Sequence, residues 1–363
     1  MKILIVDDSI VFRSGISQAL KKVPEIEVFK AVSNGKVAID FLKKEKDIDL
    51  ITLDMEMPVM NGLEAIKEIR KFNKKVIIIV FSAMTVRGAE ITIESLTHGA
   101  NDFVAKVEGG ESIEESINMI RDQLLPKIKA FSIQRGEPEK GVESSYQVRD
   151  RVSISHEPNS ELVDFNQAFD LIDEKPRMIL IGSSTGGPDA LSYIFSKIKE
   201  QLNVPIFIVQ HMPPIFTTKL AEHLNRVSSI NVKEGAHGEI AKPGFCYIAP
   251  GNYHMTLEND KGQIRIQLSK GEKVCFVRPS VDVLFKSCAL NFNGPFLSIV
   301  LTGMGRDGTN GAKALINKKC YLFVQDKESS AVWGMAGSID AENIGSRALN
   351  LIDIAMLINK FKG

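Results

Sequence analysis

The chain has 363 residues, which exceeds the usual size of one small domain and predicts two domains, or three. Apolar residues make up 44% and charged residues 25%, close to the average of soluble globular proteins, so the composition argues against wholesale disorder. Lys plus Arg and Asp plus Glu each number 45, and this balance leaves no overall charge to attract nucleic acid or an anionic membrane.

The beginning of the chain does not read as a secretion signal. Asp7 and Asp8 interrupt the first apolar run, and no apolar run approaches the ~20 residues that span a bilayer. We therefore expect a cytoplasmic protein with no direct membrane insertion. The cysteines form no CxxC pair, so we interpret them as buried thiols and not as a zinc or redox site. They are Cys246, Cys275, Cys288 and Cys320.

Residues 1–125 alternate short β-branched runs with helical patterns. Nearly continuous apolar runs of this length are typical of parallel strands with helices on both faces. The region is therefore predicted to contain five βα units, in the common strand order 2-1-3-4-5 with a crevice between the first and third strands. The five predicted strands are 2–6, 27–31, 48–53, 76–80 and 101–105.

Charged and polar side chains follow four of these strands. Because the carboxyl ends of parallel strands meet at one edge, we expect them to converge. Neighbouring carboxylates repel one another, which raises their pKa values or requires a hard cation such as Mg²⁺. With a lysine and a hydroxyl added, the cluster can hold a phosphoryl group on Asp54. One acidic residue at a strand end is usually ordinary solvation, but this combination is not. Its members are Asp7, Asp8, Asp54, Ser82 and Lys106.

The same region resembles response-regulator receiver domains, which have a flavodoxin-like fold, through DDS (7–9), LDMEMPVMNG (53–62), FSAMT (81–85) and DFVAK (102–106). The resemblance implies phosphorylation at Asp54 by a histidine kinase and a conformational switch at Ser82 and Phe103. It also implies a Mg²⁺ site. The implied ligands are Asp7, Asp8, Asp54 and the carbonyl of Glu56.

One position departs from the receiver pattern. Val107 stands after Lys106, where receiver domains usually carry a proline with a cis peptide, and a cis bond at a valine would cost ~3 kcal/mol. We therefore expect the loop that carries Lys106 to be built differently.

Residues 126–176 are polar and lack a sustained period, so they are predicted to be a linker. Strand and helix patterns resume in 177–363, which predicts a doubly wound, mostly parallel α/β domain. The predicted strands are 177–182, 204–210, 245–250, 264–268, 296–301 and 320–325, and the clearest helical stretches are 187–199, 307–318 and 346–361.

A glycine-rich turn after the first of these strands fits G-x-S-x-G and places Ser184 between a strand and a helix. Flanking glycines allow a tight turn that exposes the hydroxyl, and the helix N-terminus offers N–H groups to an oxyanion. Taken alone, the pattern is more often a helix cap or a phosphate cradle.

A serine nucleophile needs a base, and the base needs an orienting acid. His211 follows a predicted strand directly and so shares an edge with Ser184, and Asp307 follows another strand end. We prefer these two. The other candidates are His223, His237 and His254 for the base, and Asp282 and Asp326 for the acid.

The order serine, histidine, aspartate differs from that of the α/β-hydrolases. The second region instead resembles the chemotaxis protein-glutamate methylesterases, through GSSTGGPDAL (182–191), QHMPP (210–214), YIAPGNYHM (247–255), RPSVDVLF (278–285) and LTGMGRDG (301–308).

This second resemblance implies a catalytic triad of Ser184, His211 and Asp307, with the N–H groups of Thr185 and Met304 as oxyanion donors. It implies hydrolysis of glutamate methyl esters on chemoreceptors, with glutamine deamidation as a second activity and no cofactor in the catalytic domain. Combined with the receiver, it predicts an esterase regulated by phosphorylation.

Two departures from the methylesterase pattern are small. Ser183 replaces the common alanine before the nucleophile and is therefore a second candidate hydroxyl, and Ala336 stands where a proline is usual.

Two other functions compete with the esterase. Gly303, Gly305 and Gly308, with Asp326 about 20 residues further on, fit a dinucleotide-binding fingerprint, but this interpretation leaves Ser184 and His211 without a role. A transcription factor would need a basic recognition helix, and no helix of the second region gathers the positive charge.

Overall fold

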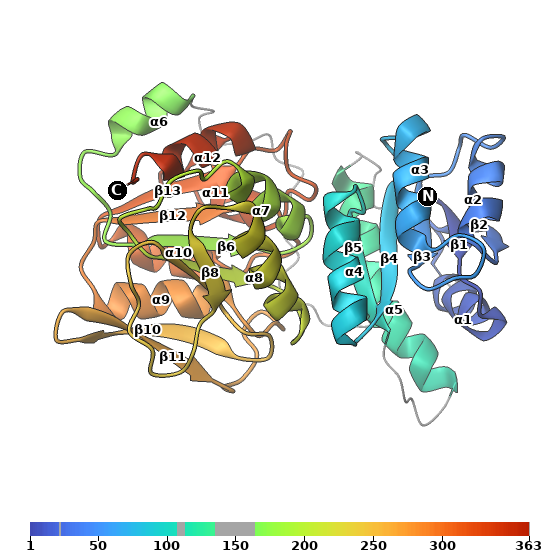
Figure 1. Ribbon diagram of the computed structural model, residues 1–363, viewed down its shortest axis with the longest axis horizontal. Helices are drawn as coiled ribbons and strands as arrows, with labels where there is room; N and C mark the ends of the chain where they lie inside the picture. Colours follow the sequence, from blue (N-terminus) through green and yellow to red (C-terminus); the bar gives the residue numbers. More distant parts are fainter. Residues whose placement is uncertain (22, 107–112, 135–163, 363) are drawn as a thin grey trace. The chain divides into compact units, whose positions relative to one another are not determined.

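The computed structural model describes residues 1–21, 23–106, 113–134 and 164–362. Contacts divide the chain into two compact units, 1–147 and 148–363 (Figure 1). None of the helices in these described ranges combines the length and apolarity that crossing a bilayer requires.

The first unit is a parallel five-stranded sheet in the order β2-β1-β3-β4-β5, which confirms the predicted (βα)5 topology. Its strands are β1 (Lys2–Val6), β2 (Glu27–Val32), β3 (Leu50–Asp54), β4 (Ile77–Ala83) and β5 (Asp102–Lys106). Its helices are α1 (Ile10–Lys21), α2 (Gly35–Leu42), α3 (Gly62–Phe72), α4 (Val86–Thr97) and α5 (Ile113–Gln134).

Local sequence explains where the helices nearest the acidic cluster begin. Asn61 accepts a hydrogen bond from the N–H of Glu64, and the Glu64 carboxylate accepts one from the N–H of Asn61, so a capping box starts α3. The Thr85 hydroxyl accepts a hydrogen bond from the N–H of Gly88 and starts α4 in the same way. These caps fix the two loops that follow β3 and β4.

The second unit is built on a seven-stranded sheet in the order β14-β13-β12-β6-β7-β9-β8, and every strand pair in it is parallel. An antiparallel hairpin of two further strands accompanies it. The strands are β6 (Ile179–Ser183), β7 (Ile206–Gln210), β8 (Asn231–Glu234), β9 (Phe245–Ile248), β10 (His254–Asp260), β11 (Gln263–Ser269), β12 (Phe296–Val300), β13 (Cys320–Gln325) and β14 (Arg347–Leu349).

Helices cover both faces of this sheet, as predicted for a doubly wound domain (Figure 1). They are α6 (Phe165–Leu171), α7 (Gly187–Ser196), α8 (Phe216–Val227), α9 (Val281–Asn291), α10 (Thr309–Ile316), α11 (Met335–Ala341) and α12 (Leu351–Asn359).

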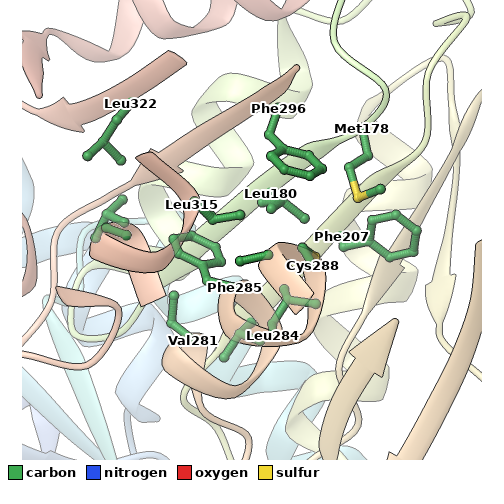
Figure 2. Close-up of a cluster of buried hydrophobic side chains, with 14 of the residues drawn as sticks. Met178, Leu180, Phe207, Val281, Leu284, Phe285, Cys288, Phe296, Leu315 and Leu322 are labelled. Carbon is green, nitrogen blue, oxygen red and sulfur yellow. The ribbon is translucent and has the colours of Figure 1, made fainter. Parts of the chain in front are cut away.

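The main apolar core fills the space between the sheet and helices α9 and α10. Figure 2 shows Val281, Leu284 and Phe285 of α9 directed toward sheet residues such as Leu180 and Phe296. All five side chains are fully buried. Each burial of this kind contributes about 1.5–3 kcal/mol, so the core fixes the start of α9 against the sheet.

The structure differs from the sequence prediction at the domain boundaries. Helix α5 continues to Gln134, past the predicted end of the first domain at residue 125. Helix α6 lies inside the predicted linker 126–176, where Lys360 donates hydrogen bonds to the carbonyls of Phe169 and Ile172 and ties this segment to the second unit. Polar composition hid both helices, since each buries only a narrow apolar face.

Other differences concern short elements and two of the four thiols. The predicted helix 346–361 begins only at Leu351, because residues 347–349 form strand β14 at the edge of the sheet. The four-residue strand β8 carries too little pattern to be predicted. Cys275 is exposed and Cys320 is half-buried, so the expectation of four buried thiols was wrong for these two.

Candidate functional site

Ser184 lies on the turn between β6 and α7. Its N–H donates to the Thr302 carbonyl at 3.1 Å, and its own carbonyl accepts from the N–H of Gly187 at 2.8 Å. Gly186 has φ +77°, a conformation that suits glycine and bends the chain into α7. Ser184 is half-buried, and within the described part of the chain its hydroxyl makes no hydrogen bond, which leaves the oxygen available to a substrate.

Ser183, the second candidate hydroxyl, is buried and occupied. It donates to the Gln210 side chain at 2.7 Å, while the Gln210 amide donates to the Ser184 carbonyl at 2.9 Å. A fully buried hydroxyl with a partner is neither reachable nor free to attack. Gln210 therefore treats the two serines differently. It binds the buried hydroxyl of Ser183, and it binds only the backbone carbonyl of Ser184.

His211 follows β7, the strand next to β6, and Ser183 and Gln210 are paired residues of these two strands. The N–H of His211 also donates to the Ser183 carbonyl at 3.2 Å. His211 Nε2 lies 2.8 Å from Asp307 Oδ2. The structure therefore brings a serine, a histidine and an aspartate from three neighbouring strand ends to one edge of the sheet.

Asp307 is buried and fully engaged. Its carboxylate accepts hydrogen bonds from Ser280 Oγ at 2.7 Å, from the N–H of Val281 at 2.6 Å and from the N–H of Asp282 at 3.0 Å. Burial alone would raise the pKa of Asp307, but the bonds from His211, Asp282 and Ser280 outweigh it and lower the pKa below the ordinary value. The carboxylate is therefore ionised and held in one orientation by the start of α9.

Of the two residues expected to donate to an oxyanion, Thr185 follows Ser184 directly and Met304 belongs to another loop. Thr185 is buried at the start of α7, and Met304 is 37% exposed on the loop after β12. Gly303, just before Met304, passes so close that a Cβ there would lie 2.9 Å from the Ser184 Cβ. Only glycine fits at this position, and its absence of a side chain lets the Met304 backbone approach the serine.

The receiver cluster also assembles at a sheet edge. Carboxylate oxygens of Asp7, Asp8 and Asp54 lie within 4.8 Å of one another. Lys106 Nζ contacts Asp54 Oδ1 at 2.8 Å and Asp7 Oδ2 at 3.2 Å. Burial raises the pKa of both Asp7 and Asp54, and the nearby lysine only partly offsets this effect.

The remaining predicted receiver residues surround that cluster. The Glu56 N–H donates to Asp54 Oδ1 at 3.4 Å, which places the Glu56 backbone beside the carboxylates. The Ser82 hydroxyl donates to the Gly88 carbonyl at 3.0 Å, toward α4. Phe103 is buried on β5. Val107, where a different loop was expected, lies outside the described residues.

Comparisons with known proteins cover both units. The family model for the response regulator receiver domain matches residues 3–118, and the model for CheB methylesterase matches residues 179–358. A protein-glutamate methylesterase/protein-glutamine glutaminase of Trichodesmium erythraeum is 39% identical, over 98% of this chain and 97% of that protein.

The chain belongs to the protein-glutamate methylesterase/protein-glutamine glutaminase family. A relative of the same name from Methanococcus maripaludis is 36% identical over 99% of this chain and 98% of its own length. The crystal structure of the Thermotoga maritima CheB methylesterase catalytic domain superposes with a TM-score of 0.50 at 37% identity, over 52% of this chain and 99% of that one. Both resemblances drawn from the sequence are thus confirmed.

Within this methylesterase fold the competing histidines have other partners. His223 pairs with the Ser192 hydroxyl at 2.8 Å, His237 Nδ1 accepts from the N–H of Leu268, and His254 Nε2 bonds the Glu272 carbonyl. His211 differs from these three in facing a buried carboxylate.

The competing acids are structural. Asp282 accepts hydrogen bonds from the N–H groups of Gly308 and Gly311 and so fixes the start of α10. Asp326 accepts from the N–H of Ser329 in a local turn. Asp307 lies between the glycines of the apparent dinucleotide fingerprint, and its bond to His211 joins that loop to the end of β7.

The supporting roles of three residues were not predicted from the sequence. The residues are Gln210, Ser280 and Asp282, the last of which accepts hydrogen bonds at the start of α10. Each lies inside a motif that carried the resemblance, next to a predicted element end. Their partners are at least 25 residues away in sequence, so only the folded chain shows what they hold.

The receiver residues fit a Mg²⁺ ion. Asp7 and Asp54 are buried with raised pKa values, Asp8 is exposed toward solvent, and all three offer oxygen ligands within 4.8 Å. Oxygen ligands at such spacing suit a hard divalent cation.

Proposed function

We propose that this chain hydrolyses the γ-methyl esters of methylated glutamates on chemoreceptors, with Ser184 as nucleophile, His211 as general base and Asp307 as the acid that orients it. The observation that carries the proposal is the 2.8 Å bond between His211 and Asp307, one strand away from the turn that presents Ser184. Membership of the methylesterase family supplies the reaction class.

The hydrogen bond to Asp307 determines which ring nitrogen takes the proton. In neutral His211 the Nε2–H donates to the carboxylate, so Nδ1 carries the lone pair. Nδ1 accepts the Ser184 proton as the oxygen attacks the ester carbonyl carbon. The ionised Asp307 then stabilises the imidazolium without taking its proton.

The attack forms the bond from Ser184 Oγ to carbon and moves the carbonyl π pair onto oxygen. The N–H groups of Thr185 and Met304 donate to this oxyanion. When the intermediate collapses, the methoxy oxygen takes the proton from His211 and leaves as methanol. Water then gives a proton to His211 and attacks the acyl-enzyme, which releases glutamate and restores the Ser184 hydroxyl.

The same steps accept a glutamine side chain, because an amide carbonyl is attacked in the same way and ammonia replaces methanol as the leaving group. Glutamine deamidation is therefore the second activity of the site.

The receiver regulates this reaction in our proposal. A histidine kinase donates a phosphoryl group to Asp54, and Lys106 and Ser82 contact its oxygens. Asp7, Asp8, Asp54 and the Glu56 carbonyl would hold Mg²⁺, which neutralises phosphoryl charge when bound. Phosphorylation of Asp54 then raises the rate of ester hydrolysis, which requires a free-energy difference between an inactive and an active state of the chain.

Methanol release from a methylated receptor fragment tests the nucleophile. We expect Ser184→Ala to lower the rate by about 10⁵-fold, because the attacking group is lost. The matched variant Ser183→Ala removes a hydroxyl that is already bonded to Gln210, and we expect a loss of no more than about tenfold. Full activity in Ser184→Ala, with loss in Ser183→Ala, would reverse the assignment.

A further inference from the structure

An exposed aromatic side chain stands on a tight turn, next in sequence to a cysteine that lies near Asp307. Val274 and Val277 exchange backbone hydrogen bonds of 3.2 and 3.0 Å, which closes a two-residue turn with Cys275 and Phe276 at its tip. Phe276 is 87% exposed, more than any other large apolar side chain among the described residues. A phenylalanine this exposed has its whole ring available to a partner.

The backbone of the turn does not favour these residues. Cys275 has φ +51° and Phe276 has φ +63°, a region that asparagine and glycine adopt most readily. A turn selected for its backbone alone would carry those residues. The phenylalanine is therefore accounted for by its side chain and not by the turn.

The base of the turn is held rigidly. The Arg278 guanidinium donates to Asn252 Oδ1 at 2.6 Å and to the carbonyls of Lys270 and Gly271 at 2.9 and 2.7 Å. On the other side, His254 Nε2 bonds the Glu272 carbonyl at 2.8 Å. The ring is thus presented from a fixed support, which lowers the entropy lost on binding.

The turn also lies at the catalytic edge. Cys275 Sγ and carboxylate oxygens of Asp282 and Asp307 are within 4.8 Å of one another, and Asp307 is the partner of His211. Phe276 is therefore one residue away from a thiol that lies within 4.8 Å of the triad acid.

We propose that Phe276 docks the protein substrate by packing against an apolar side chain close to the esterified glutamate. The inference rests on the proposed function, because an ester on a protein side chain brings its neighbouring residues to the rim of the site. Aromatic side chains at such rims contribute a large share of binding energy. Phe276 then sets affinity for protein substrates and leaves the chemistry at Ser184 untouched.

The test compares a large and a small ester, using the full chain with a small-molecule phosphodonor and Mg²⁺. The probes are a methylated chemoreceptor cytoplasmic fragment and N-acetylglutamate γ-methyl ester. Phe276→Asn suits the positive φ, so it keeps the turn. We expect it to raise KM for the fragment by about tenfold, with kcat unchanged and small-ester hydrolysis unchanged.

Two further variants isolate the ring. Phe276→Tyr keeps an aromatic ring and is expected to restore the KM of the unchanged chain. Leu290→Ser removes a comparably exposed apolar side chain, 82% exposed in the last turn of α9, and is expected to leave the hydrolysis of both substrates unchanged. Equal melting temperatures show that the variants are folded.

An unchanged KM for the fragment in Phe276→Asn would overturn the inference. So would faster small-ester hydrolysis by that variant without phosphodonor, because Phe276 would then contact the receiver and not the substrate. The proposed function fails separately, if the unchanged chain hydrolyses neither ester, and the inference falls with it.

Discussion

The two units place their functional side chains in the same position and give them opposite electrostatics. In both, residues at the carboxyl ends of neighbouring parallel strands converge. In the receiver, burial raises the pKa of Asp7 and Asp54 even beside Lys106. In the catalytic domain, hydrogen bonds lower the pKa of the equally buried Asp307.

The difference follows from how each carboxylate is supported. Asp307 accepts two backbone N–H groups from the start of α9, a hydroxyl and the His211 ring, so its charge is satisfied within the protein. Asp54 has one backbone N–H at 3.4 Å and the shared lysine. Asp7 and Asp54 can therefore gain from an added positive charge, whereas the charge of Asp307 is already balanced by donors within the protein.

The largest of the three effects predicted here concerns Asp307 in the catalytic domain. Asp307→Asn keeps the shape but removes the charge that orients His211 and stabilises its imidazolium, so we expect methanol release to fall about 10⁴-fold. Steady-state rates on the receptor fragment measure this. Asp326→Asn is the control, since Asp326 belongs to a local turn. A loss under tenfold in Asp307→Asn would show that the acid is dispensable.

A smaller effect concerns the receiver. Asp54→Asn cannot accept the phosphoryl group, so we expect the stimulation of methanol release by phosphodonor and Mg²⁺ to disappear, a change in the 5–150-fold range typical of coupled sites. The surface variant Asp47→Asn should respond like the unchanged chain. Equal rates with and without phosphodonor in the intact, unchanged chain would reject gating.

The smallest expected effect is on stability. Mg²⁺ at ten times its dissociation constant should raise the receiver melting temperature by ~5 °C, and Asp8→Asn should reduce this shift.

Stability should also depend on pH. Because the pKa values of Asp7 and Asp54 are raised in the folded state, ionisation of these two carboxyls lowers the stability above pH 3.8. Protonation restores that stability as the pH falls through their folded-state pKa values.

Ionisation of Asp307 affects stability in the opposite direction. Because its pKa is lowered in the folded state, the ionised carboxylate contributes stability above pH 3.8, and this contribution is lost as the pH falls through the folded-state pKa of Asp307. Melting curves from pH 3 to 7 for the unchanged chain, Asp54→Asn and Asp307→Asn separate the two. The stability advantage of Asp54→Asn should shrink toward acid pH; a constant difference would contradict the assigned pKa directions.

Hydrophobic periodicity and sequence motifs were enough to predict where the strands end. A buried parallel strand such as β6 is a continuous apolar run, and the sequence shows where that run stops. These patterns also placed Ser184 and His211 at the same edge of the sheet, and the structure shows that their strands are neighbours. The support of Asp307 could not be predicted, since the N–H groups of Val281 and Asp282 come from the start of α9, at least 25 residues away in sequence. Likewise the sequence offered two adjacent serines, and only packing around Gln210 distinguishes them.

Covalent labelling tests the central claim most directly. A fluorophosphonate reacts with a serine that has an adjacent base, and peptide mapping by mass spectrometry locates the label. The account predicts a label on Ser184 in the intact chain and its loss in His211→Gln. A label on Ser183, or a label on Ser184 that is unaffected by His211→Gln, would contradict a triad of Ser184, His211 and Asp307.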